Sequence, residues 1–175
     1  MTREIIRPEN AAEAEETTRK EIQLACFLVG SQMYALDILR IKEVIRPLKL
    51  RPVPKAPEFV EGVINLRGVV IPVVDLRRRF DQPVVSAGQK SRIIVSVLGG
   101  KIIGLIVDEV AEVRNFTRQE IQPAPRFIKG KKTDYFIGVC QRDDDLVMII
   151  NLEKILSSDE KIDFEQIQNE LNERS

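Results

Sequence analysis

From residue 24 onward the chain alternates short apolar runs with turn signals, a pattern typical of strands. The apolar runs Leu24–Val29 and Met33–Leu36 are separated by Gly30-Ser31-Gln32, so we predict a hairpin there. A second hairpin is predicted, because the residues of Val60–Leu66 have the period of two that a strand requires, Arg67-Gly68 can form a turn, and Val69–Leu76 can return as the second strand. The chain therefore favours a mainly β structure.

The segment between the two hairpins has a different pattern. Ile38, Ile41 and Ile45 fall three and four residues apart, which predicts one or two helical turns lying on a sheet. Proline lacks a backbone donor and biases the residue before it away from helix, so a proline-rich stretch predicts an extended connection. Such a stretch lies here, because four prolines fall within eleven residues: Pro47, Pro52, Pro54 and Pro57.

This plan recurs along the chain. With an offset of 69 residues over Leu24–Ile45, apolar residues meet apolar residues at 11 of 22 positions, against roughly 4 expected from a 43% apolar composition. An offset of 76 then aligns Gly62 with Gly138. The seven extra residues fall near Ile128–Asp134, where we expect a loop. The sequence therefore predicts two copies of one plan, each about 60 residues long.

Units of this size bury only about 60% of the surface that their unfolded chains expose, so the two copies should pack together. Short antiparallel strands close economically into small barrels, which also removes exposed sheet edges. We predict two small β-barrels side by side, over about residues 22–88 and 89–156, with exchange of strands between them left open.

The two ends of the chain carry other patterns. Residues 1–21 hold little apolar material and are predicted to be a flexible tail. Residues 157–175 are predicted to form a C-terminal helix, because Ser157–Glu160 can form a capping box and apolar residues follow at helical spacing, at Phe164, Ile167 and Leu171.

Composition removes several classes of function. Lysine plus arginine and aspartate plus glutamate each total 27 and histidine is absent, so the net charge is zero and there is no general attraction to nucleic acid. Without histidine, catalytic triads and most zinc sites are excluded. Cys26 and Cys140 lie in apolar runs and are predicted to be reduced core thiols. We expect no enzyme, metal or cofactor.

The same composition bears on location. A charged content of 31% argues against a membrane span, and residues 1–22 lack the unbroken apolar stretch of a secretory signal. We therefore expect a cytoplasmic protein without direct membrane insertion.

Several ordered segments resemble the bacterial chemotaxis coupling protein, the CheW family. They are Tyr34–Ile45, Pro54–Pro57, Phe59–Arg77, Gly104–Asp108, Ile121–Phe127 and Ile149–Leu152, so the similarity covers about residues 24–156. The resemblance implies a CheW-like domain over residues 22–156, made of two five-stranded SH3-like barrels. It also implies a non-enzymatic adaptor, monomeric alone, that joins the regulatory domain of the histidine kinase CheA to the cytoplasmic tips of chemoreceptors.

The resemblance assigns roles to individual residues. It implies that Ile41, Glu43 and Arg67 bind the receptor. The resemblance implies that Arg67 lies near Glu43, and a guanidinium fork can hold a carboxylate, so we hypothesise a Glu43–Arg67 pair. The corresponding place in the second copy is Asp143, followed by two further aspartates, so the copies differ sharply in charge here. Alternatively, Arg67 is an idle, solvated turn residue.

Kinase binding is implied for Val44 and Gly62, and a ring interface between coupling proteins and kinase domains for Phe127. Each has a structural alternative: barrel packing for Ile41 and Val44, relief of crowding at a strand bend for Gly62, and a barrel plug for Phe127. Gln122 stands where some relatives carry a basic residue, which removes a charge from the second contact.

Other interpretations stay open beside this one. The basic clusters Arg77–Arg79 and Lys129–Lys132 would fit an OB-like nucleic-acid-binding barrel, but aromatic residues make up only 5% of the chain, so we favour solvated surface for both clusters. Within the same fold, the chain could couple another receptor–kinase system, such as one in motility or development.

Overall fold

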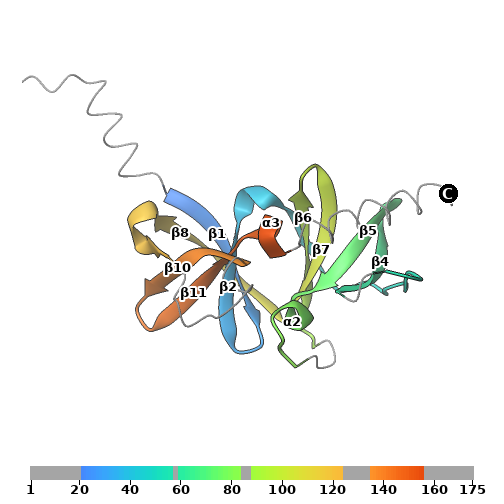
Figure 1. The fold of residues 1–175 in the computed structure, drawn as a ribbon, viewed down its shortest axis with the longest axis horizontal. Coiled ribbons are helices and arrows are strands. Elements are labelled where there is room, and N and C mark those ends of the chain that lie inside the picture. Colours follow the sequence, from blue (N-terminus) through green and yellow to red (C-terminus); the bar gives the residue numbers. More distant parts are fainter. Residues whose placement is uncertain (1–20, 57–58, 84–87, 124–134, 156–175) are drawn as a thin grey trace, which may run out of the picture.

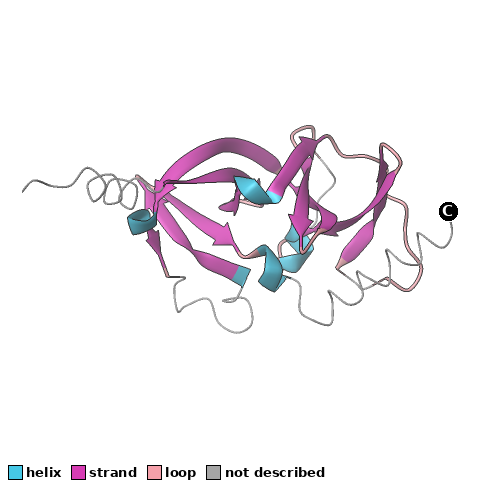
Figure 2. Cartoon of the chain, turned by 90° about the horizontal axis from the view of Figure 1, so that it is seen from above, coloured by secondary structure: helices cyan, strands magenta, loops and turns pink. Residues whose placement is uncertain are grey.

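The structure is a computed structural model that describes residues 21–56, 59–83, 88–123 and 135–155. Two curved groups of strands lie side by side (Figure 1). Figure 2 shows them from above, with most of the short helical segments near the place where the groups meet. Five of the sequence predictions concern segments outside the described residues: the N-terminal tail up to residue 20, the C-terminal helix, the loop near Ile128–Asp134, Phe127 and the Lys129–Lys132 cluster.

The first predicted hairpin is confirmed, but the helical turns after it are only partly correct. β1 (Glu21–Val29) pairs antiparallel with β2 (Gln32–Asp37). Only Ile38–Arg40 is helical, as the 3-10 turn η1, and β3 (Ile41–Ile45) is a strand. The prediction of helix beyond residue 40 is therefore wrong. Three of the five residues of β3 are β-branched, which favours extended backbone, and β6 provides the hydrogen-bonding partner.

The second predicted hairpin is also confirmed, as β4 (Val60–Leu66) and β5 (Val69–Asp75), which pair antiparallel. The short helix α2 (Leu76–Arg79) follows directly. The remaining elements of the described residues are β6 (Arg92–Leu98), β7 (Lys101–Val107), β8 (Glu109–Thr117), η2 (Arg118–Glu120), β9 (Ile121–Gln122), β10 (Phe136–Arg142), β11 (Asp145–Ile150) and α3 (Leu152–Ile155).

The strands form two sheets that do not follow the two halves of the sequence. The five-stranded sheet has the order β3-β6-β7-β5-β4, and the six-stranded sheet the order β8-β1-β2-β11-β10-β9. We call the two parts the five-stranded lobe and the six-stranded lobe. The first hairpin, β1–β2, belongs to the lobe built mainly from the second half, and β6–β7 belongs to the other. Because each sheet contains strands from both halves, neither half contains all the strands of a sheet.

The internal repeat is visible in the pairing. Each sheet has one parallel pair that joins the halves, β5 with β7 and β2 with β11. On β4, Val63 forms an antiparallel bridge with Arg51, and on β10 Val139 pairs with Gln122 of β9. Val63 and Val139 are 76 residues apart, which is the second offset of the sequence repeat. The two lobes are therefore related by structure as well as by sequence.

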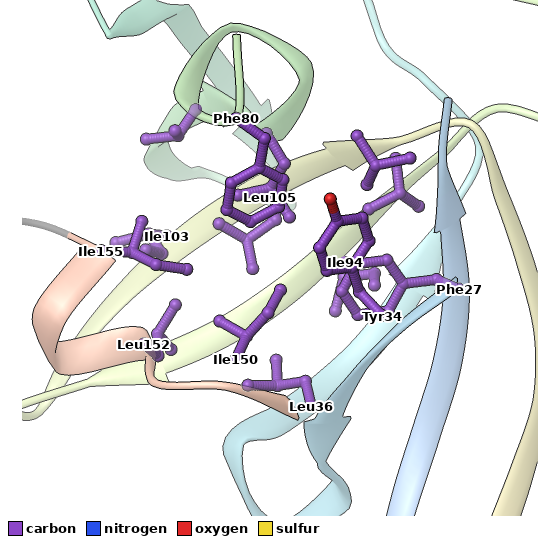
Figure 3. Packing of buried hydrophobic residues seen from close by; sticks show 14 of the residues in the cluster. Phe27, Tyr34, Leu36, Phe80, Ile94, Ile103, Leu105, Ile150, Leu152 and Ile155 are labelled. Carbon is purple, nitrogen blue, oxygen red and sulfur yellow. The ribbon is translucent and has the colours of Figure 1, made fainter. Parts of the chain in front are cut away.

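A continuous apolar core joins the lobes. Figure 3 shows residues of β1, β2, α2, α3 and the neighbouring strands meeting in one cluster. Tyr34 lies at its centre, with ring centroids 4.7 Å from Phe80, 6.0 Å from Phe136 and 6.3 Å from Phe27. Burial raises the pKa of Tyr34. Because Phe80 follows α2 and Phe136 starts β10, the lobes share one core.

Each lobe also has a smaller core of its own. The six-stranded lobe encloses Cys26 and Cys140, both fully buried among aliphatic side chains and Phe116. This confirms the prediction that both are reduced core thiols. The five-stranded lobe encloses aliphatic residues only: Ile64, Ile71, Val73, Ile93 and Val95.

Candidate partner-binding surface

Glu43 and Arg67 form a two-pronged ion pair on the surface of the five-stranded lobe. Arg67 Nη1 donates to Glu43 Oε2 at 3.0 Å, and Arg67 Nη2 donates to Glu43 Oε1 at 3.0 Å. The guanidinium fork therefore holds both carboxylate oxygens, the strongest geometry for such a pair. The pair that we hypothesised from the sequence is confirmed.

Local backbone chemistry places Arg67 at the tip of the β4–β5 hairpin. Arg67 and Gly68 both have positive φ, at 52° and 84°, as a two-residue type I′ turn requires. The Gly68 N–H donates to Asn65 Oδ1 at 2.9 Å, which closes the turn from inside the hairpin. The arginine side chain is thereby carried outward on a fixed backbone.

The pair also spans the sheet. β3, which carries Glu43, and β4, which leads into the turn, are the two edges of the five-stranded sheet. A contact from the hairpin tip to β3 therefore closes the lobe between strands that no backbone hydrogen bonds join. The side chain of Arg67 remains 72% exposed and that of Glu43 31% exposed.

The ion pair holds both charged side chains in a fixed direction at the surface. Its hydrogen bonds with Glu43 raise the pKa of Arg67, so the guanidinium stays charged. An exposed pair contributes little to folding, because water screens its charges and both side chains lose freedom in forming it. The pair therefore fixes the direction of two polar groups at the surface and adds little to the stability of the lobe.

Two exposed apolar residues lie next to the members of the pair in sequence, although neighbouring side chains on a strand point to opposite faces. Val44, next to Glu43 on β3, is 42% exposed, and Val69, directly after the turn, is 50% exposed. Apolar area beside oriented charges is the composition of a reversible protein interface. Ile41 differs, because its side chain is partly buried against the shared core of the lobes. Its position therefore supports a packing role.

Gly62 has a clear backbone role. A Cβ atom at this position would lie 2.6 Å from the Arg51 carbonyl oxygen, which already accepts a hydrogen bond from the Val63 N–H at 2.8 Å. At Gly138 in the six-stranded lobe, a Cβ atom would lie 2.5 Å from the Gln122 carbonyl oxygen. Each glycine therefore permits the same close approach between two chain segments. Gly62 itself is buried.

The arginine cluster Arg77–Arg79 corrects a sequence prediction. We favoured solvated surface for it, but Arg77 is buried. Its guanidinium donates to both oxygens of Asp75, at 3.0 and 2.9 Å, and the Arg77 backbone N–H donates to Asp75 as well, at 2.9 Å. These contacts raise the pKa of Arg77. An aspartate two residues before an arginine, at the end of an apolar strand, was the signal available in the sequence.

The described residues contain no cluster of side chains suited to hold a metal ion. None of the helices in this part of the chain combines the length and apolar character needed to cross a membrane.

Comparison with known proteins identifies the family. Residues 23–160 match the family model described as the CheW-like domain. The chain is 35% identical over 147 residues to the chemotaxis protein CheW of Klebsiella aerogenes, covering 84% of this chain and 87% of that protein. It is also 35% identical over 138 residues to the Thermotoga maritima protein of the same name, covering 78% and 89%. Protein FrzA of Myxococcus xanthus is 30% identical over 154 residues, covering 86% and 94%.

A solved structure agrees with these relatives. The crystal structure of the scaffolding protein TtCheW from Thermoanaerobacter tengcongensis matches with a TM-score of 0.73 and 34% identity, covering 79% of this chain and 94% of that one. The chain belongs to the CheW family.

Proposed function

We propose that the chain is a non-enzymatic adaptor that couples chemoreceptors to the histidine kinase CheA. Its family membership and the names of its relatives, which include a scaffolding protein, support this proposal. The described surface fits it, because the oriented charges of Glu43 and Arg67 and the exposed side chains of Val44 and Val69 come from β3 and the β4–β5 hairpin of one lobe. Activity would then consist of binding energy distributed over surfaces.

The observation that carries the proposal is the exposed Arg67–Glu43 pair. A 72% exposed arginine held by two hydrogen bonds adds little to folding, so its fixed direction is useful chiefly for a partner. Arg67 and Glu43 would contact the receptor tip, with Ile41 supporting β3 from behind. Contacts of roughly 1,600 Å² in total would suit such a reversible assembly.

The kinase regulatory domain would bind the five-stranded lobe near Val44. Gly62 would act indirectly, by keeping the edge formed by β4 and Arg51 flat enough to dock. Phe127 stays our candidate for the ring interface. We further propose that the protein is a monomer when alone, and that it is cytoplasmic and recruited to membrane-associated receptor arrays.

The test is reconstitution of the purified chain with a chemotaxis kinase and a receptor fragment, measuring ternary assembly and kinase output. Arg67→Ala should keep a near-native melting temperature and weaken capture of receptor or kinase by about tenfold or more. Lys90→Ala is the matched control, because Lys90 and Glu109 form another exposed pair, with a 3.7 Å contact, on a different part of the surface.

Unaltered capture of both partners by Arg67→Ala would end the assignment of this surface. Failure of the unmodified chain to join kinase and receptor would end the proposed function itself. The alternative, coupling in another receptor–kinase system, is tested by repeating the assay with components of such a system. FrzA, a relative without CheW in its name, makes that comparison worthwhile.

A further inference from the structure

The three consecutive arginines of α2 make contacts with different lobes. α2 follows β5 of the five-stranded lobe. Arg78 pairs with Glu61 of β4, within that lobe. Arg77 and Arg79, on either side of it, both reach residues of the six-stranded lobe or of the connection to it. Figure 1 shows α2 and α3 between the two groups of strands.

Arg77 reaches the connection between the lobes. Besides Asp75, its guanidinium contacts Asp108, with 3.4 Å between Nη1 and Oδ1. Asp108 is the single residue between β7 of one sheet and β8 of the other. Its other carboxylate oxygen accepts the Gly30 N–H of the β1–β2 turn at 2.6 Å, and its own N–H donates to the Leu28 carbonyl at 2.9 Å. The crossing point is therefore tied to both lobes.

Arg79 forms the second tie. Its Nε–H donates to the Ile155 carbonyl of α3 at 2.7 Å. Its guanidinium carbon lies 5.2 Å from the ring centroid of Phe59 and 5.4 Å from that of Tyr135. Phe59 precedes β4 and Tyr135 precedes β10, so one cation lies over one aromatic ring from each lobe.

These contacts follow the internal repeat. Phe59 and Tyr135 are 76 residues apart, and so are Arg79 and Ile155, which matches the offset found in the sequence. Arg79 thus lies at the place where equivalent parts of the two copies meet. Its own equivalent is an isoleucine, so a single side chain joins both copies there.

We propose that Arg77 and Arg79 are positioning residues that fix the angle between the two lobes, so that partners held on different parts of the surface take a defined geometry. This proposal rests on the proposed function, since the angle matters only if the chain joins two partners. Arginine suits the task because its planar fork can donate a hydrogen bond and lie over aromatic rings at once, whereas a lysine ammonium loses the directed Nε–H donor.

The test measures the angle and the coupling separately. Spin labels at Val69→Cys in the five-stranded lobe and Ile137→Cys in the six-stranded lobe report the distance between lobes, because both positions are at least half exposed whereas Cys26 and Cys140 are buried. The parent should give a narrow distance distribution. Arg79→Gln should broaden it at least twofold, and Arg79→Lys, which keeps the cation between the rings, should restore part of it.

Arg78→Gln is the matched control, because Arg78 lies in the same helix and contacts only its own lobe among the ion pairs described. It should leave the distribution unchanged. With unlabelled proteins, Arg79→Gln should bind the isolated kinase regulatory domain within about twofold of the parent, while receptor-dependent control of kinase output falls several-fold. Binding without control distinguishes positioning from contact.

An unchanged distance distribution in Arg79→Gln would overturn the proposal that Arg79 fixes the angle between the lobes. A broadened distribution with undiminished control of the kinase would overturn its positioning role. Should Arg79→Gln fail to fold by circular dichroism, Asp108→Asn tests the other tie in the same assay, with the same two outcomes. A parent protein that does not couple kinase to receptor contradicts the proposed function and leaves the distance measurement intact.

Discussion

The hairpin tips of the two lobes have similar backbone structure, but the charged residues on the edge strands and hairpins have opposite signs. In the five-stranded lobe, Glu43 on the edge strand holds Arg67 at the hairpin tip through two 3.0 Å contacts. In the six-stranded lobe, Arg114 on edge strand β8 contacts Asp145, just after the β10–β11 turn, at 3.5 Å. At both places a charged side chain on the edge strand reaches toward a hairpin of the same sheet, and the signs are reversed.

The apolar setting of the tips is shared. Val44 and Val113, which are 69 residues apart, are 42% and 51% exposed on the two edge strands. Arg67 and Asp143 occupy the same turn position with φ values of 52° and 55°. The duplicated backbone therefore supplies a similar shape at both tips, while the charges that the tips carry differ. Two equivalent frames can in this way recognise different surfaces.

The short helices α2 and α3, which follow β5 and β11, also have equivalent positions and different charges. α2 carries three arginines, of which Arg77 is buried and ion-paired. α3 carries Glu153 and Lys154 at the positions equivalent to Arg77 and Arg78, and both are exposed. The repeat thus places a buried ion pair at one position and a solvated residue at its equivalent.

Removal of the buried Arg77–Asp75 ion pair should cause the largest loss in the free energy of unfolding. Arg77→Leu leaves Asp75, 2% exposed, without its partner, and removal of one member of a buried pair costs about 3–5 kcal/mol. Glu153→Gln at the equivalent position removes only an exposed contact with Arg40 at 3.1 Å and should cost about 0–1 kcal/mol. Urea denaturation of both variants measures the difference, and equal costs would contradict the asymmetry.

Both buried glycines should be sensitive to an added Cβ atom, and Gly62 more so, because its φ of 156° is also rarely adopted by other residues. Gly62→Ala and Gly138→Ala each place a Cβ within 2.6 Å of a backbone carbonyl oxygen, so one segment must shift, at a cost of about 1–3 kcal/mol. Denaturation midpoints measure both. Gly138→Ala is thus the control for folding damage: if Gly62 matters to the kinase through its own lobe, Gly62→Ala loses more kinase binding than the other variant at equal loss of stability. Equal losses of binding would make the effect one of folding alone.

Much of the fold follows from the sequence because period-two alternation and turn residues are local signals. They predicted both hairpins of the first half, and self-comparison predicted the duplication. The helical expectation at Ile41–Ile45 was wrong, because three- and four-residue spacing in a short segment also fits a strand whose partner, β6, lies some 50 residues farther along. A local pattern does not identify a distant pairing partner.

The candidate surface was predictable in part. The Glu43–Arg67 pair was expected by combining charge chemistry with the family resemblance, and the structure contains it. The arrangement of Arg77 and Arg79 was not, because three adjacent arginines give the same local signal whether they face water or bridge two lobes. Their contacts with Asp108 and Ile155 depend on how the sheets exchange strands, which is a property of the whole chain.

The ion pairs at the two hairpin tips should differ in coupling energy, by less than the effects above. A double-mutant cycle on Arg67 and Glu43 should give a small favourable coupling energy at low salt, because the contact is bidentate. The cycle on Arg114 and Asp145 should give less, since one 3.5 Å contact joins them and Glu112 also holds Arg114. Both values should fall in high salt. A larger coupling at the second tip would reverse the ranking.

The smallest expected effect concerns pH at Glu61, whose equivalent in the second copy is Ile137. Burial raises the pKa of Glu61 above 4.5, although Arg78 lowers it in part. The native carboxyl therefore binds its proton more tightly than the unfolded one, and the free energy of unfolding declines as the pH rises from the unfolded pKa through the folded one.

Glu61→Gln removes this titration, so the stability of the parent relative to the variant should decline between about pH 4 and the folded pKa and stay level above it. Ile137→Glu transplants the carboxyl to a position that is 60% exposed, where solvation leaves no cause for the same decline. Unfolding free energies of the three proteins across the pH series decide between them. A flat difference between parent and Glu61→Gln would show that the contact with Arg78 offsets desolvation, and a rise with pH would show that it outweighs desolvation. With a flat difference, the two copies would not differ in their response to pH at this position.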